Sequence, residues 1–181
     1  MPFRNRVDPF GAIHALAARG LFTGNRGVIH DPETQTLLSR RWTTTAWIVC
    51  ALIHPKGVKR KPMDRNAAGG GAGWTELFFL DEPTALSAGH RPCFYCRREA
   101  AKSFAAAFAH GCGRESVPAP EMDRILHAER LASGGHVRTL AASEVRALPD
   151  GAMVAYGPNA FAVKGGKLLP WSFSGYGAAR A

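Results

Sequence analysis

Two cysteines three positions apart, Cys93 and Cys96, constrain this chain more than any other feature of its sequence. They follow a turn that contains Gly89 and Pro92, and a run of good helix formers starts at Arg97. A turn ahead of a helix directs both thiolates toward one ion, and the amides at the helix start support their charge. The alternatives are a redox pair, which normally follows a strand in a βαβ unit, or two buried thiols. The pattern predicts a zinc site.

A zinc site needs further ligands beyond this pair. Cys50 ends a hydrophobic stretch in which a thiolate can face the knuckle, and His54 follows it by four positions next to a proline turn. His127, on a helix further along the chain, is a competing donor. We expect Cys50 as the third ligand and either His54 or His127 as the fourth.

The pattern of the remaining sequence predicts an α+β fold in a single compact domain. Residues 42–53 and 74–80 have strand composition, and Asp81 is placed to cap a short helix that Gly89 ends. Two longer helices are expected at 97–110 and 121–132, followed by an antiparallel β-meander across 152–171. We expect three parts: a basic N-terminal arm at 1–39, with a short helix considered between 12 and 21; a zinc-binding core at 40–112; and a helix plus the meander at 113–181, which complete the same domain.

Positive charge is concentrated near the start of the chain. The net charge is +9, and residues 1–65 hold 11 Lys and Arg against 4 acids. Such an imbalance favours a polyanionic partner, of which nucleic acid is the commonest, although it is also compatible with a basic solubilising surface. With DNA as the favoured partner, the residues expected to contact phosphates are Arg4, Arg6, Arg26, Arg40, Arg41, Lys56, Lys59, Arg60 and Lys61.

Nothing in the sequence predicts a membrane partner. No apolar run reaches the roughly 18 residues that a spanning helix needs. The first six residues are polar and charged rather than signal-like, so we expect a cytoplasmic protein. In a reducing compartment its four cysteines are expected as thiols or metal ligands.

The block from Leu77 to Arg97 resembles the metal-binding domain of the bacterial Ada DNA-repair and regulatory proteins. It contains a strand with paired Phe, a short helix ending in Ala-Gly, an aromatic position, and then Arg-Pro-Cys-x-x-Cys. Upstream, Trp47 to Cys50 is similar to the strand that delivers the first zinc-bound cysteine of that family.

The resemblance implies a zinc site of four cysteines, one of which accepts a methyl group from a DNA phosphotriester. Cys50 matches the methyl acceptor, and Cys93 and Cys96 match the last two ligands. The place of the second ligand is occupied by His54, and a Gly-rich insert precedes Trp74. The rest of the chain resembles neither the helix-turn-helix nor the methyltransferase domain of full Ada proteins.

A second group of polar residues lies at 127–129. Glu129 is seven positions after Met122 and therefore falls on the apolar stripe of the predicted helix. A carboxylate on such a stripe is expected either to pair with an arginine or to act beside the metal. Zinc deaminases combine His-x-Glu with Pro-Cys-x-x-Cys, and both motifs occur here, although in reversed order.

These patterns favour a zinc-containing nucleic-acid-binding protein linked to DNA repair or regulation. One alternative is a zinc-dependent enzyme, either transferring an alkyl group to Cys50 or acting as a deaminase-like or nuclease-like hydrolase with Glu129. A second alternative is an interaction adaptor in which the zinc is purely structural. Three protein ligands and a water would indicate hydrolysis, whereas four closed ligands would indicate binding.

Overall fold

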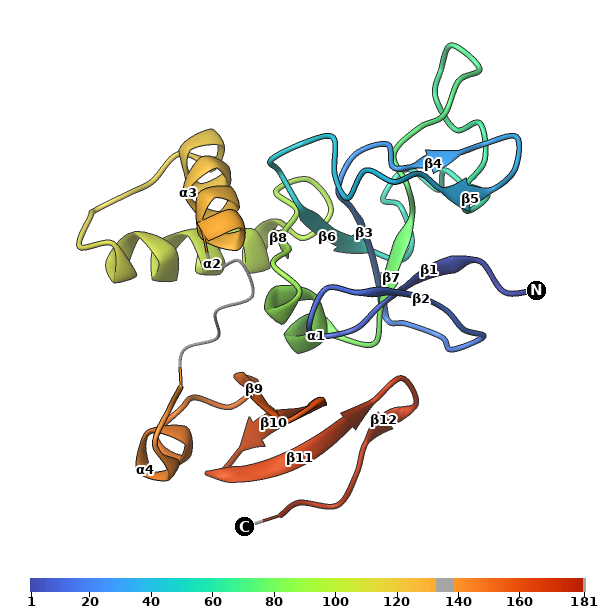
Figure 1. The fold of residues 1–181 in the computed structure, drawn as a ribbon. Helices are drawn as coiled ribbons and strands as arrows, with labels where there is room; N and C mark the ends of the chain where they lie inside the picture. The colour runs from blue at the N-terminus through green and yellow to red at the C-terminus, as the bar shows by residue number, and fades with distance from the viewer. Residues whose placement is uncertain (133–138, 181) are drawn as a thin grey trace.

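Six short strands form a mixed sheet at the centre of the computed structural model, which describes residues 1–132 and 139–180 (Figure 1). Their order across the sheet is β2-β1-β7-β3-β6-β8. The pairs β1–β7 and β6–β8 run parallel, and the other neighbours are antiparallel. The strands are β1 (Arg4–Val7), β2 (Ile13–Ala15), β3 (Phe22–Asn25), β6 (Ile48–Ala51), β7 (Leu77–Phe79) and β8 (Arg91–Pro92).

The first 39 residues, which we expected to form an arm, contribute three strands to this sheet. The helix considered between residues 12 and 21 is not formed, because Ile13–Ala15 is strand β2. Gly24 lets β3 approach its neighbour, since an added Cβ would lie 2.3 Å from the carbonyl oxygen of Ile48. A separate hairpin follows, made of β4 (His30–Asp31) and β5 (Thr36–Leu37). The N-terminal segment is therefore part of the core.

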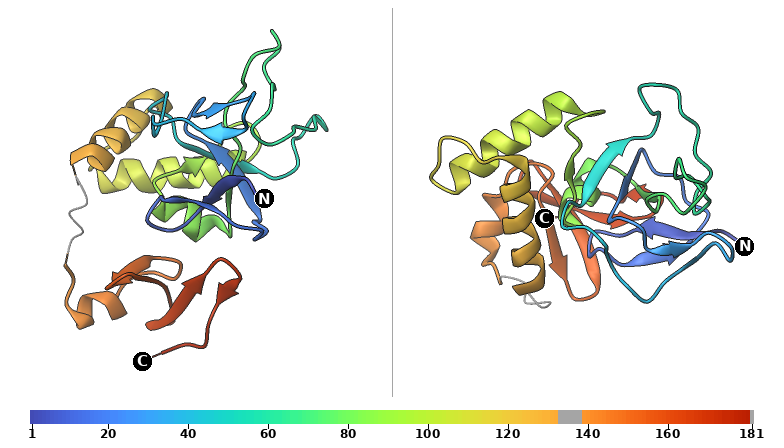
Figure 2. Two further views of the ribbon diagram at one scale, coloured as in Figure 1. Left: turned by 45° about the vertical axis from the view of Figure 1, so that its right-hand side comes forward. Right: turned by 90° about the horizontal axis from the view of Figure 1, so that it is seen from above.

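Three helices pack around the sheet. Helix α1 (Glu82–Ser87) begins at Asp81, whose carboxylate accepts from the amide of Thr84 at 2.9 Å, as the sequence predicts. It buries Ala85 and Ala88 against Val7, Val49, Leu77 and Phe79 of the sheet. Helices α2 (Arg98–Gly111) and α3 (Ala119–Ala132) lie beside the β8 edge and share a smaller apolar cluster (Figure 2).

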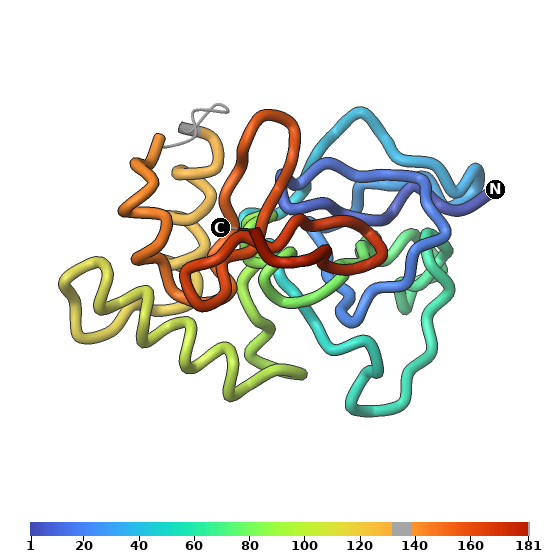
Figure 3. The backbone as a smooth tube through the Cα atoms, turned by 90° about the horizontal axis from the view of Figure 1, so that it is seen from below, coloured from blue at the N-terminus to red at the C-terminus, as the bar shows by residue number. Residues whose placement is uncertain are grey.

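The C-terminal part is an antiparallel meander with the order β12-β11-β10-β9, preceded by the short helix α4 (Ala142–Arg146). Its strands are β9 (Met153–Tyr156), β10 (Asn159–Lys164), β11 (Lys167–Ser172) and β12 (Gly175–Tyr176). The meander crosses the α1 side of the molecule (Figure 3). The Tyr176 hydroxyl donates to Asp81 at 2.7 Å, and the Trp171 indole donates to Thr84 at 2.9 Å. The α+β class is thus confirmed, with one mixed sheet and antiparallel sheets.

Among the residues that the structure describes, no helix has the length and apolar character needed to cross a membrane.

Candidate metal centre

The parallel pairing of β6 with β8 brings the first cysteine to the other two. Val49 is in register with Pro92, so the next residue of each strand, Cys50 and Cys93, lie side by side. The amide of Cys93 donates to the carbonyl of Val49 at 3.0 Å and continues the ladder one step beyond β8. The chain then turns through Cys96 into α2, and the amide of Arg97 donates back to the carbonyl of Cys93 at 3.0 Å.

The sulfur atoms of Cys50, Cys93 and Cys96 all lie within 4.8 Å of one another. In a tetrahedral zinc site with Zn–S bonds of about 2.3 Å, neighbouring sulfurs are about 3.8 Å apart. The observed spacing needs only a small contraction to reach that geometry. Three thiols drawn from two distant segments therefore form a group that could hold a metal ion.

Backbone amides support negative charge on two of these sulfurs. The amide of Ala51 donates to Cys96 Sγ at 3.3 Å, and the amide of Tyr95 donates to Cys93 Sγ at 3.4 Å. Such outer contacts orient thiolate ligands and are usual around metal sites. Hydrogen bonding from Cys50, the largest cause, lowers the pKa of Cys93 to about 5, while the contact with Cys93 raises the pKa of Cys50. Within the group, the hydrogen bond between the two thiols thus favours negative charge on Cys93 over Cys50.

The two histidines considered as fourth ligands lie outside this group. His54 is in the turn after β6, where its ring is 5.8 Å from that of Tyr95, and its Nδ1 accepts from the amide of Lys56 at 3.2 Å. His127 is on α3, with its ring 5.3 Å from that of Trp42. His54 is thus next to the knuckle, whereas His127 belongs to an aromatic cluster.

The expectation that Glu129 faces the core is wrong, because its side chain is exposed. The apolar cluster between α2 and α3 extends along α3 only as far as Leu126, and Glu129 lies beyond it. The buried acid of this helix is Asp123. It binds Arg91 of β8 through two hydrogen bonds of 2.7 Å. No local pattern in the sequence indicates this role, because the pairing joins two elements that are far apart along the chain.

The predicted phosphate-contacting residues differ in their accessibility. Arg26 is buried and only 1% exposed. Arg6 is half-buried, with its guanidinium 4.7 Å from the centre of the Phe78 ring, and Arg60 lies 4.3 Å from that of Trp74. Six side chains remain exposed, namely Arg4, Arg40, Arg41, Lys56, Lys59 and Lys61.

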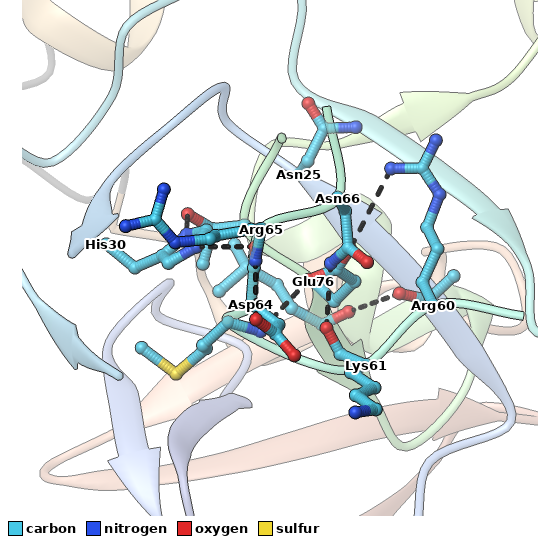
Figure 4. Close-up of polar contacts among 12 residues, drawn as sticks. Asn25, His30, Arg60, Lys61, Asp64, Arg65, Asn66 and Glu76 are labelled. Atoms are coloured by element: carbon cyan, nitrogen blue, oxygen red, sulfur yellow. Dashed lines mark hydrogen bonds and ion pairs between the residues drawn. The ribbon is translucent and has the colours of Figure 1, made fainter. Parts of the chain in front are cut away.

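A polar network fixes the segment that follows these lysines (Figure 4). The buried carboxylate of Glu76 accepts from the amide of Met63 at 3.1 Å and from the side-chain amide of Asn66 at 3.2 Å. Asn66 also donates to the carbonyl of Lys61 at 2.7 Å, and Arg60 lies 3.8 Å from Glu76. The network holds the backbone of Lys61 while its ammonium group stays in solvent.

Comparisons of this chain with protein-family models, with curated proteins and with solved structures gave no match. The likeness of residues 77–97 to the Ada metal-binding domain therefore remains a resemblance of sequence. What this structure establishes about function is the group of three cysteines and their surroundings.

Proposed function

We propose that this chain is a zinc-binding protein in which Cys50, Cys93 and Cys96 hold one ion. The gathering of three sulfurs within 4.8 Å carries the proposal, because the cysteines come from the ends of two strands and the turn before a helix. Thiolate ligands favour Zn²⁺ over harder divalent ions such as Mg²⁺ and Ca²⁺. They also bind Cu⁺ and iron–sulfur clusters. Two amide-to-sulfur hydrogen bonds further fit the group to a metal.

His54 is the better of the two histidines for the fourth position. It follows β6 by three residues, and its ring lies against Tyr95 between the two knuckle cysteines. Its Nδ1 accepts from the amide of Lys56, and no hydrogen bond to its Nε2 is formed by the described residues, so this nitrogen could bind a metal after a movement of the turn. His127 would have to leave its contacts with Trp42 and Trp47 to reach the cysteines.

The role proposed for this centre is to support a nucleic-acid-binding surface, with DNA the favoured partner. The strand that carries Cys50 leads directly into the loop that presents Lys56, Lys59 and Lys61. These side chains are exposed, and the Glu76 network anchors the end of the loop. A cluster of exposed cations on an anchored segment is suited to phosphate contacts, which position a protein without reading sequence.

The metal assignment is tested by elemental analysis of purified wild-type protein and five variants. We expect one zinc per chain, its loss in Cys50→Ser and Cys93→Ser, and its retention in Cys112→Ser. Cys112 is the matched control because it is exposed and lies outside the group of three. His54→Ala should weaken zinc binding in a competition with a chelator, whereas His127→Ala should not. Equal losses from Cys50→Ser and Cys112→Ser, or no metal in the wild type, would contradict the assignment.

The nucleic-acid role has its own measurement, the fluorescence anisotropy of a labelled DNA duplex. We expect binding at about 50 mM salt that weakens strongly by about 200 mM, since phosphate contacts release counterions. Removing the metal with a chelator should also weaken DNA binding, because the cross-link that the ion makes between the cysteines of β6 and the knuckle would be lost. If the zinc-loaded protein does not bind DNA at low salt, the nucleic-acid role is contradicted, whereas the metal assignment is not.

A further inference from the structure

A second cationic site lies away from the cysteines, in a pocket of about 200 Å³ between the β1–β2 turn, the end of α1 and the end of α3. Two arginines, Arg41 and Arg130, line it together with the aromatic rings of Trp42, Trp47 and His127. No carboxylate is among its lining residues in the described part of the chain. Cations beside aromatic faces, with no acid among them, suit a ligand that is both anionic and planar.

The positive charge of the pocket extends beneath its surface. The buried guanidinium of Arg26 lies 4.1 Å from the Trp47 ring centre, and that of Arg130 lies 4.6 Å from it. Burial, then the charges of Arg41 and Arg130, lower the pKa of Arg26 to about 9, and Asp8 offsets this only in part. Two guanidiniums therefore lie over a single indole, and the charge of a third, Arg41, acts on one of them.

The backbone is shaped to admit these arginines. Gly89 has φ +82°, and an added Cβ would lie 2.9 Å from Nε of Arg130. Gly11 has the same φ, and an added Cβ would lie 3.3 Å from a terminal nitrogen of Arg26, which itself donates to the Gly11 carbonyl at 3.0 Å. Glycine at both turns thus makes room for a charged side chain.

Donor groups remain available for a ligand at this place. Within residues 1–132 and 139–180, Arg41 is exposed and takes part in no ion pair or hydrogen bond through its side chain. The buried indole N–H of Trp47 also has no hydrogen-bond partner in that part of the chain. A buried donor without a partner is unusual in folded proteins and calls for an explanation such as a ligand or a water.

We propose that this pocket binds a nucleoside monophosphate unit, either as a free nucleotide or as the 5′ end of a nucleic-acid strand. The choice of ligand rests on the proposed nucleic-acid role, but the site is separate from the cysteines. The volume is below the roughly 300–1,000 Å³ of sites for drug-sized ligands, so the pocket encloses only part of a mononucleotide and cannot take a dinucleotide. The base stacks on Trp42, and the phosphate is held by Arg41 and Arg130.

The test titrates the full-length, zinc-loaded protein with 5′-AMP and follows tryptophan fluorescence. We expect saturable binding that Arg41→Ala weakens about tenfold or more, as the loss of a charged hydrogen bond implies. Arg40→Ala is the matched control, since the neighbouring Arg40 is exposed but does not line the pocket, and it should change the affinity less than about twofold. Equal effects of the two substitutions would overturn the proposal, as would the absence of saturation.

Two further ligands and two variants of Trp42 separate the base from the phosphate. Adenosine and inorganic phosphate should each bind at least about tenfold more weakly than AMP, and Trp42→Leu should weaken AMP about tenfold through lost stacking while leaving phosphate unaffected. Trp42→Phe, which keeps a ring, should restore most of the affinity. Phosphate that binds as tightly as AMP would reduce the pocket to an anion site and overturn the nucleotide assignment.

A short single strand with and without a 5′ phosphate identifies the source of the ligand. Tighter binding of the phosphorylated strand than of AMP would identify a strand end as the ligand, and equal affinity would identify a free nucleotide. In either case, Arg41→Ala should abolish the binding if the ligand occupies this pocket. If the protein binds duplex DNA but not AMP, the pocket proposal is contradicted and the proposed nucleic-acid role is not. AMP binding in a protein that binds neither zinc nor duplex would reject only the proposed function.

Discussion

The buried pair of Arg91 and Asp123 ties the strand before the knuckle to helix α3. Arg91 is 5% exposed and precedes Cys93 by two positions, and Asp123 is also 5% exposed. Two parallel hydrogen bonds of 2.7 Å join them. Removing one partner of a buried pair leaves the other charge without compensation, and this loss is costly.

We therefore expect Asp123→Asn to lower the free energy of unfolding by roughly 3–5 kcal/mol. Chemical denaturation monitored by circular dichroism measures this change. Glu121→Gln is the control, because Glu121 lies on the same helix and also pairs with an arginine, Arg114, but at the surface. Its effect should be far smaller. Similar effects of the two substitutions would show that the Arg91–Asp123 pair does not secure the knuckle.

At the residue scale, the sequence identified Cys93 and Cys96 because their spacing alone brings two sulfurs together. It identified Cys50 less directly, because Cys50 lies 43 positions before Cys93 and meets it only when β6 pairs with β8. Glu129 was misplaced because helical periodicity gives a face but not the point at which the neighbouring helix ends. The partnership of Arg91 with Asp123 is a tertiary contact that no local pattern encodes.

Among the elements, α1 shows how a short helix can organise several parts of a molecule. Its cap residue Asp81 binds Thr84 at the helix start and Tyr176 of the C-terminal meander. Its far end turns at Gly89, which lies against Arg130 of α3. One helix of six residues thus connects the sheet, the meander and the Arg–Trp pocket.

Gly89→Ala is expected to destabilise the protein by about 1 kcal/mol or more, because φ is +82° and the new Cβ would press on Arg130. Gly111→Ala provides the opposite case. Gly111 ends α2 without a positive φ, and an added Cβ there meets nothing within 4 Å, so alanine should be neutral or stabilising by up to about 1 kcal/mol. Thermal unfolding of both variants tests the contrast, and a stabilised Gly89→Ala would contradict it.

Helices α1, α2 and α3 and most of the meander were predictable as elements, whereas α4, β12 and the N-terminal strands were not. α1, α2 and α3 have clear caps or periodic apolar residues, and the turns at Gly157 and Gly165 separate three strands rich in apolar residues. In contrast, β1, β2 and β3 are three or four residues long, too short for alternation to stand out. They form because β7 pairs with β1 and β3, β6 pairs with β3, and β1 in turn pairs with β2. These pairings depend on the whole fold.

For the molecule as a whole, the distribution of charge is the feature with the clearest consequence for binding. The net charge is +9, yet Arg26 is buried, and Arg6 and Arg60 are half-buried over aromatic rings. The cations that remain for a polyanion are therefore fewer than the composition implies. Lys59 and Lys61 are exposed in the loop that the Glu76 network anchors.

We expect Lys59→Gln combined with Lys61→Gln to reduce the slope of log affinity against log salt for duplex DNA by about 2, since each phosphate contact contributes about 0.9. Lys164→Gln with Lys167→Gln removes the same charge from the exposed ends of two meander strands and is the control. It should leave the slope nearly unchanged. Equal reductions in the two double variants would mean that net charge, and not this loop, determines binding.

The pairing of β6 with β8 has a consequence for how the molecule matures. A slip of one residue between these strands would turn Cys93 to the opposite face of the sheet from the one it shares with Cys50. Only one register offers all three sulfurs to an ion, and that register exists only once β8 has paired with β6. If the cysteines hold an ion as proposed, its capture would favour the chains in which β6 and β8 have paired in this register.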